Sequence, residues 1–305
     1  MSVEHLSLPP GHLPPPPAYA RPKLLGTYSH LPDRRIVPGD ASMAYYRPAP
    51  LGADLTYGAK ERIDRDESVE EHLDGLVESF RRIGRERPGG VVTWRGMLTR
   101  FMTAPFETEG WAMDAVALNG SVYLELYDPP EERAKRKPGL CRATWAMPTR
   151  HTRRILRATR RWTGPRAGRE QSTRMCSGAT DSSIVESSIG EIPVTIGGEV
   201  DCVDGTPNPG LSKCVELKTN KVINDERGDN IFHKKLLKHW AQSFLLGIPD
   251  RRGHPVLAAQ LPNSAYSGYS RGTEAGLASR TCAALLVRCA RDGDAEHTAE
   301  RPAPA

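Results

Sequence analysis

Residues 196–219 read IGGEVDCVDGTPNPGLSKCVELKT, and the fold of the chain depends on them. They contain two short apolar runs, 196–203 and 214–218, in which acids stand where a core strand normally carries Val or Leu. Asp, Gly, Pro and Asn, which are typical of turns, fill the segment between the runs. The pattern predicts a β-hairpin with a loop of about ten residues.

The acids of this hairpin fall on one side of each predicted strand. Because side chains alternate along a strand, Glu199 and Asp201 share a face, and so do Glu216 and Lys218. If the two polar faces coincide, three carboxylates and one ammonium group lie on one patch. Like charges at such close range oppose ionisation unless a cation neutralises them, and Mg²⁺ and Mn²⁺ prefer oxygen ligands.

An acid followed by Glu-x-Lys on the neighbouring strand is typical of metal-dependent nucleases, in which the lysine orients or activates a water molecule. The alternative is a surface hairpin with solvated charges. The metal site is favoured because Ile, Val, Cys and Leu flank the polar residues.

The length of 305 residues suits one large domain or two small ones. No run of about eighteen apolar residues occurs, so neither a transmembrane helix nor a membrane partner is expected. Residues 1–22 are rich in proline and predict a disordered or polyproline arm rather than a signal sequence. The cysteines form no C-x-x-C pair, which favours a reduced intracellular compartment. They are Cys141, Cys176, Cys202, Cys214, Cys282 and Cys289.

The basic charge is concentrated in one segment. The net charge of +5 and the pI of about 8.9 indicate an anionic partner. Residues 133–174 carry fourteen Lys and Arg and a single acid, Glu170, so the remainder of the chain has a net charge of −8.

The periodicity of apolar residues predicts an amphipathic helix and, after it, a junction between a strand and a helix. Residues 66–87 predict an amphipathic helix capped by Asp66 or Ser68 and ended by the Pro-Gly-Gly at 88–90. Residues 91–94 predict a buried strand that turns into a helix at Arg95. Backbone N–H groups and a guanidinium at such a junction suit a phosphate, although an ion pair with a surface acid is the alternative.

Residues 111–128 predict a hairpin, because two alternating runs flank Asn119-Gly120. Glu125 in this hairpin is interpreted as a solvent-facing residue rather than a metal ligand. Residues 229–246 predict another amphipathic helix, capped by Asp229. Lys235, Lys238 and Gln242 share one face of it, which would contact a nucleic-acid backbone or water.

Four motifs in this order resemble those of the DXO-type decapping nucleases, in particular the fungal members that partner the nuclear 5′→3′ exoribonuclease. They are WRGMLTR (94–100), GGEVDC (197–202), VELKT (215–219) and HKKLLKHWAQSFLLGIP (233–249). The resemblance covers residues 26–128 and 182–249. It implies an α/β nuclease domain over 23–249, with a mixed β-sheet core flanked by helices. It also implies removal of defective or non-canonical caps from RNA 5′ ends, cleavage of 5′ pyrophosphate links, a nuclear location and that exoribonuclease as partner.

The resemblance assigns roles to residues of this sequence. The metal ligands for two Mg²⁺ or Mn²⁺ ions would be Glu199, Asp201, Glu216 and the carbonyl of Leu217. Lys218 would complete the catalytic group with these three acids. The RNA contacts would come from Glu199, Lys218, Arg95 with its neighbours Trp94 and Gly96, Gln242 and, by weaker alignment, Arg34 and Glu71.

Two departures from the family pattern affect the expected activity. A family motif of Gly, aromatic, any residue, aromatic and Glu, whose Glu completes the metal site, is absent before Glu199. Residues 144–150 admit codons that read Met-Gly-Tyr-Ala-Tyr-Glu in another frame, so 142–180 is expected to be frame-shifted and 250–305 to be aberrant or truncated. The alternatives to a decapping enzyme are a DNA nuclease of the same type and a catalytically impaired partner that stabilises an exoribonuclease.

Overall fold

The fold is built on a seven-stranded mixed sheet with the order β2-β1-β6-β7-β3-β5-β4. In the computed structural model the described residues are 17–31, 33, 35–46, 72–84, 89–107, 109–127, 129, 131, 180–205, 210–216 and 225–249. The predictions for 1–16, 142–179 and 250–305 lie outside them. The strands are β1 (Lys23–His30), β2 (Ile36–Pro38), β3 (Gly90–Trp94), β4 (Met113–Leu118), β5 (Ser121–Leu126), β6 (Thr180–Ile189) and β7 (Ile192–Val200).

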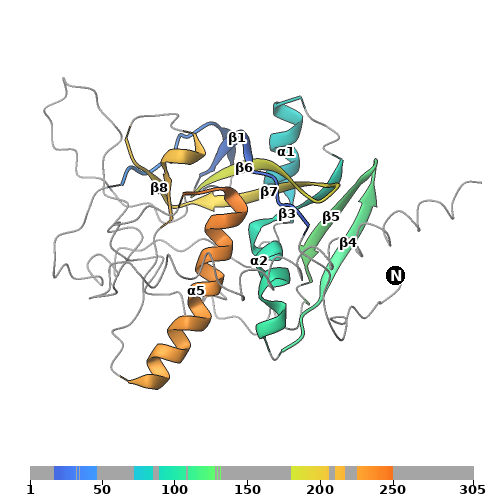
Figure 1. Ribbon diagram of the computed structural model, residues 1–305. Helices are drawn as coiled ribbons and strands as arrows, with labels where there is room; N and C mark the ends of the chain where they lie inside the picture. The colour runs from blue at the N-terminus through green and yellow to red at the C-terminus, as the bar shows by residue number, and fades with distance from the viewer. Residues whose placement is uncertain are drawn as a thin grey trace, which may run out of the picture.

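The centre of the sheet is parallel and its two sides are antiparallel. β3 pairs in parallel with β5 and with β7, whereas the pairs β1·β2, β1·β6, β6·β7 and β4·β5 are antiparallel. Helix α1 (Asp74–Arg82) lies on one side of the sheet, and α2 (Arg95–Thr103) and α5 (Glu226–Leu246) lie on the other (Figure 1). The predicted class, a mixed sheet flanked by helices, is confirmed. No helix in the described part of the chain is both long and apolar enough to span a membrane.

Each face of the sheet has its own core. On the α1 side, Leu73, Leu76 and Phe80 pack with Tyr28, Val92 and Ile184. On the other side, apolar side chains of α2 and α5 pack against β3, β5, β6 and β7. This larger cluster includes Leu98, Phe101, Met102, Leu237, Ala241, Leu245, Val122, Val194 and Ile196, all nearly inaccessible to solvent.

The predicted hairpin over 196–218 exists in a reduced form. Only β8 (Cys202–Val203) and β9 (Cys214–Val215) pair with each other, as a separate two-stranded sheet. The first apolar run mostly belongs to β7 of the main sheet, and Asp201 lies between the two sheets. The prediction of one continuous strand over 196–203 was therefore wrong, because the chain leaves the main ladder after Val200 and pairs again from Cys202.

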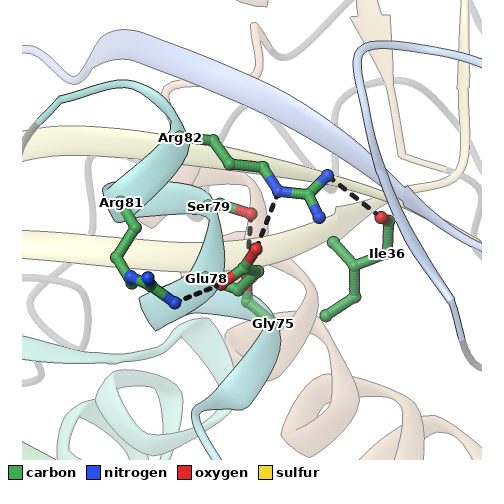
Figure 2. A network of polar contacts seen from close by, with 6 residues as sticks. All are labelled: Ile36, Gly75, Glu78, Ser79, Arg81 and Arg82. Carbon is green, nitrogen blue, oxygen red and sulfur yellow. Dashed lines mark hydrogen bonds and ion pairs between the residues drawn. The ribbon is translucent and has the colours of Figure 1, made fainter.

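Helix α1 is shorter than the predicted helix over 66–87. Its C-cap is Ile83, and Gly84 follows with φ of 71°, so the helix ends before the Pro-Gly-Gly that was predicted to end it. Residues 66–71, including both predicted caps, lie outside the described residues. Figure 2 shows the contacts that hold its C-terminal half: Arg82 bonds both to Glu78 (Nε to Oε1, 2.9 Å) and to the carbonyl of Ile36 on β2 (3.2 Å). The hydrogen bond from Arg82 lowers the pKa of the Glu78 carboxyl.

Turn and cap residues explain the other boundaries. Asn119 and Gly120 have φ of 53° and 78° and join β4 to β5, as the Asn-Gly signal predicts. Helix α5 begins three residues before the predicted start, because the side chain of Asp225 accepts the N–H of Gly228 at 2.6 Å. It ends at Gly247, whose φ of 66° is left-handed.

Strand β6 was not predicted, because its sequence TDSSIVESSI shows little apolar alternation. Its polar residues Asp181, Ser182 and Ser183 are nevertheless buried. The Ser29 hydroxyl donates to Asp181 and accepts the N–H of Ser42 at 3.0 Å, which satisfies part of this polar layer. Strand β1, which pairs with β6, was missed for the same reason.

The segment 17–22, the end of the predicted arm, contacts the domain. Tyr19 forms a β-bridge with Ile189 and donates its hydroxyl to the carbonyl of Leu245 at 2.8 Å. The centroids of the Tyr19 and Phe244 rings are 4.7 Å apart. The Ser187 hydroxyl donates to the carbonyl of Ala20 at 2.6 Å. These contacts join the segment to both β6 and the last turn of α5.

Candidate functional site

The centre of the candidate site is an ion pair between Arg95 and Glu216. Arg95 is the first residue of α2, and Glu216 directly follows β9. Arg95 Nη1 lies 3.0 Å from Glu216 Oε2, and the two side chains are only 11% and 4% exposed. Arg95 was predicted to bind either a phosphate or a surface acid. The structure shows an ion pair with an acid, but this acid is buried and belongs to the predicted catalytic group.

The other two predicted acids lie where β7 ends. Glu199 is paired with Ser182 across the β6·β7 ladder, and Asp201 is 2% exposed immediately beyond the strand. The β8·β9 register pairs Cys202 with Val215, so its continuation by one residue sets Asp201 opposite Glu216. The backbone thus places two of the predicted ligands at adjacent positions of neighbouring segments.

Two glycines before Glu199 allow close packing on both faces of β7. A Cβ on Gly197 would lie 2.7 Å from Cζ3 of Trp94, and one on Gly198 would lie 2.9 Å from a methyl carbon of Leu246. Trp94, the last residue of β3, thereby packs directly on β7. The same Cβ on Gly198 would be 3.2 Å from the Cβ of Arg95, so both glycines determine how closely the β3–α2 junction approaches the acids.

Helix α2 provides no side-chain acceptor for the N–H groups of its own first turn. Its N-cap residue, Trp94, makes no side-chain capping bond, and the first turn contains no acidic residue. Gly96 in that turn is exposed, with open space around its Cα. The first N–H groups of a helix lack partners inside it and carry partial positive charge, so this end suits an anion.

Helix α5 contacts the site through the backbone of Gln242. Arg95 Nη1 lies 3.5 Å from the backbone carbonyl of Gln242, which is half-buried. The predicted basic face of α5 is partly used within the protein, because Lys238 Nζ lies 2.5 Å from Glu107 Oε1. The Lys238 side chain is still 50% exposed, so contact of this face with a nucleic-acid backbone or water stays a prediction.

The segment 44–46 is hydrogen-bonded to β8 of the two-stranded sheet, which begins directly after Asp201. Tyr46 N–H donates to the carbonyl of Val203 at 2.7 Å, and Val203 N–H donates to the carbonyl of Ala44 at 2.9 Å. Burial, and then the charges of Asp40 and Asp181, raise the pKa of the Tyr45 hydroxyl. Burial, and then Cys202 and Asp204, raise the pKa of the Tyr46 hydroxyl.

Carboxylate oxygens in a buried setting suit a hard divalent cation. However, among the described residues no three of the His, Cys, Asp and Glu side chains gather closely enough to hold a metal ion. The described acids therefore supply the right donor chemistry without forming a complete cage by themselves.

Four predicted site residues, Arg34, Glu71, Leu217 and Lys218, lie outside the described residues. One residue was misjudged by the sequence reasoning. Glu125 does not simply face solvent: its side chain is 26% exposed and accepts the N–H of Leu73 at 3.0 Å. The signal was its shared face with Tyr123, which packs under α1.

The chain is similar to known proteins over about three quarters of its length. The family model described as RAI1 like PD-(D/E)XK nuclease matches residues 20–250. The chain belongs to this family. It is 53% identical over 254 residues to the decapping nuclease RAI1 of Cryptococcus neoformans, an alignment that covers 77% of this chain and 64% of that protein. The chain thus spans less than two thirds of the length of this curated relative.

Solved structures of RAI1-like nucleases share the fold. Rai1 of Scheffersomyces stipitis, in complex with (3′-NADP)⁺ and calcium, has a TM-score of 0.68 at 20% identity, covering 90% of this chain and 84% of that one. Candida albicans Rai1 in complex with pU5-Mn²⁺ has a TM-score of 0.65 at 18% identity, covering 94% and 86%. At these identities the likeness establishes the architecture alone.

Proposed function

We propose that this protein is a metal-dependent RNA 5′-end decapping nuclease and pyrophosphohydrolase. Its substrates would be incompletely capped, NAD-capped and 5′-triphosphate RNA, and its product RNA with a 5′ monophosphate. The observation that carries the proposal is the buried Arg95–Glu216 pair, which joins an anion-binding group to a predicted metal ligand directly after β9. Membership of a family of RAI1-like nucleases supports the reaction class.

Two divalent ions, Mg²⁺ or Mn²⁺, bound by Glu199, Asp201, Glu216 and the Leu217 carbonyl, would supply Lewis-acid charge at the scissile phosphate. Complexes of relatives with Mn²⁺ and with calcium support a divalent cofactor. In this chain, Lys218 would donate a hydrogen bond to the attacking water and orient it.

The RNA 5′ end would be held mainly by the start of α2. The guanidinium of Arg95 and the N–H groups around Gly96 would bind phosphate oxygens, with Trp94 supporting the junction. Gln242 would contact the RNA from α5, with Glu199 and Lys218 touching it at the reacting phosphate. Arg34 and Glu71 would make further contacts along the RNA strand. The complex of a relative with pU5-Mn²⁺ supports such a binding site for a 5′-phosphorylated RNA.

By the same resemblance, the protein would act in the nucleus, in quality control of RNA 5′ ends, together with a nuclear 5′→3′ exoribonuclease. Co-purification of the tagged chain with that exoribonuclease from nuclear extract tests the partner. A protein that is excluded from the nucleus and co-purifies with no exoribonuclease would contradict this part of the proposal.

A second function is a catalytically impaired partner that stabilises the exoribonuclease. It is favoured by one observation, the absence from residues 129–180 of the aromatic-x-aromatic-Glu motif that completes the family's metal site. Expression of this chain beside a version whose residues 144–180 are read in the alternate frame separates the two functions. If the alternate version alone hydrolyses RNA, this chain is catalytically impaired, and its co-purification with the exoribonuclease then tests the partner role.

The enzymatic proposal is tested with RNA carrying a 5′ triphosphate, an unmethylated cap or a NAD cap, incubated with the protein and Mn²⁺. The expected product is 5′-monophosphate RNA, detected by its sensitivity to a monophosphate-dependent exonuclease. Duplex DNA is the comparison substrate. Cleavage of the duplex with no attack on any RNA 5′ end would identify a DNA nuclease instead.

A further inference from the structure

Strand β5 contributes a carboxylate that is fully engaged at the start of α1. Glu125 Oε1 accepts the backbone N–H of Leu73 at 3.0 Å, and Oε2 lies 2.7 Å from Nδ1 of His72. A carboxylate oxygen only accepts, so the hydrogen of this second contact is on Nδ1 of His72. Glu125 on β5 thus binds two consecutive residues, His72 and Leu73, that are more than fifty positions away in the sequence.

This carboxylate replaces a cap that α1 lacks. The N-cap residue of α1 is Leu73, which has no side-chain acceptor, and no side-chain capping bond from it exists. The first N–H groups of a helix need acceptors, and negative charge is favourable at this end. Glu125 supplies both from a neighbouring element, so the start of α1 is fixed to the sheet.

The same contact extends to the candidate site. The indole Nε1 of Trp94 donates to the carbonyl of His72 at 3.4 Å. The Trp94 ring packs so closely on Gly197 that an added Cβ would lie 2.7 Å from it. Trp94 immediately precedes Arg95, and Gly197 lies two residues before Glu199. A continuous chain of contacts therefore runs from Glu125 through His72 and Trp94 to the strand that carries Glu199.

We propose that Glu125 is a positioning residue for the RNA 5′-end site. Its contacts are with His72 and the backbone of Leu73, and it acts by holding His72 and, through it, the Trp94 ring. The proposal rests on the proposed function for its kinetic consequence, but the coupling between Glu125 and Trp94 is a property of the fold. Because Trp94 leads into Arg95, loss of Glu125 impairs the grip on the substrate phosphate more than the chemical step.

The test compares Glu125→Ala and Glu125→Gln with a matched control at the other end of the same helix, Arg82→Ala. Arg82 holds α1 through Glu78 and the Ile36 carbonyl (Figure 2), and it lies ten residues after His72 in the sequence. Both alanine variants are expected to lower the Tm. Only Glu125→Ala is expected to raise KM, by roughly tenfold with kcat changed less than about twofold, because it displaces a binding group. Glu125→Gln keeps one acceptor and is expected to recover most of the KM.

A second readout does not depend on turnover. Hydrogen exchange of the segments 72–84 and 90–103 is expected to increase in both segments for Glu125→Ala, but only in the first for Arg82→Ala. Equal effects of the two alanine variants on KM, or unchanged exchange over 90–103 in Glu125→Ala, would overturn the proposal. If the wild-type protein hydrolyses no RNA, the proposed function fails, and the exchange experiment still decides whether Glu125 positions Trp94.

Discussion

Arg95 Nη1 lies 3.0 Å from Glu216 Oε2, although the two residues are 121 positions apart in the sequence. The pair joins the start of α2 to the end of β9, and both side chains are nearly excluded from solvent. Two groups assigned to different tasks, one to phosphate and one to metal, therefore neutralise each other. Replacement of either residue is therefore expected to change both the stability of the protein and its affinity for a cation.

Removal of one partner of this pair is expected to destabilise the protein strongly. Arg95→Met or Glu216→Gln leaves the other group buried without its counter-charge, which costs on the order of 3 kcal/mol of unfolding free energy. The double variant is expected to lose less than the sum of the single losses. Urea unfolding of the four proteins measures the coupling, and additive losses would contradict the pairing.

The affinity for Mn²⁺ is expected to rise when Arg95 is replaced. A guanidinium bound to Glu216 competes with a cation for the same carboxylate, so Arg95→Gln is expected to bind Mn²⁺ roughly tenfold more tightly in calorimetric titrations. Arg100→Gln, five residues further along α2, is the matched control. An unchanged or weaker affinity in Arg95→Gln would show that Glu216 does not exchange one positive group for another.

Gly197→Ala is expected to disturb the β3–α2 junction. The new Cβ would lie 2.7 Å from the Trp94 ring, too close for a rigid aromatic side chain to accommodate without moving. Such overpacking costs about 1–3 kcal/mol, and hydrolysis is expected to fall with it because Arg95 follows Trp94. Gly110→Ala, where no atom lies within 4 Å of the added Cβ, is the control. Equal unfolding midpoints of the two variants would mean that this contact is not tight in solution.

The alkaline limb of stability is expected to depend on Tyr46. Burial raises the pKa of its hydroxyl above the ordinary value of 10.0. Below about pH 10 both the folded and unfolded states hold the proton, so the contribution is complete. As the pH rises from there through the folded-state pKa, the unfolded chain releases the proton first and the unfolding free energy falls. Tyr46→Phe lacks this proton and is expected to lose less stability between pH 9 and 11, relative to pH 8. Parallel pH profiles for the two proteins would contradict a buried hydroxyl.

Local patterns in the sequence predicted the elements that are determined locally. Asn119-Gly120 fixed the β4–β5 hairpin, since its positive φ angles match a two-residue turn. The buried run before Arg95 predicted the β3–α2 junction, because an apolar strand and an amphipathic helix have different periods. These elements depend on neighbours within a few residues, so periodicity and turn chemistry suffice.

Long-range contacts account for what sequence reasoning missed. Strand β6 is buried among polar partners, and its buried Asp181 is satisfied by Ser29 on β1, which no local pattern reveals. Glu125 caps a helix across space, and its sequence neighbours give only its face of the strand. The break at Asp201 arises because β7 and β8 pair with different strands. In each case the decisive partner lies on another element.

The most direct test of the central claim is RNA hydrolysis by wild-type protein and by Glu199→Ala and Asp201→Ala variants, with Mn²⁺ and 5′-triphosphate RNA. Glu191→Ala is the control, because Glu191 is exposed at the opposite end of β7. The wild-type and Glu191→Ala proteins are expected to give 5′-monophosphate RNA and the other two none, with all four proteins folded by circular dichroism. Full hydrolysis by either the Glu199→Ala or the Asp201→Ala protein would contradict it.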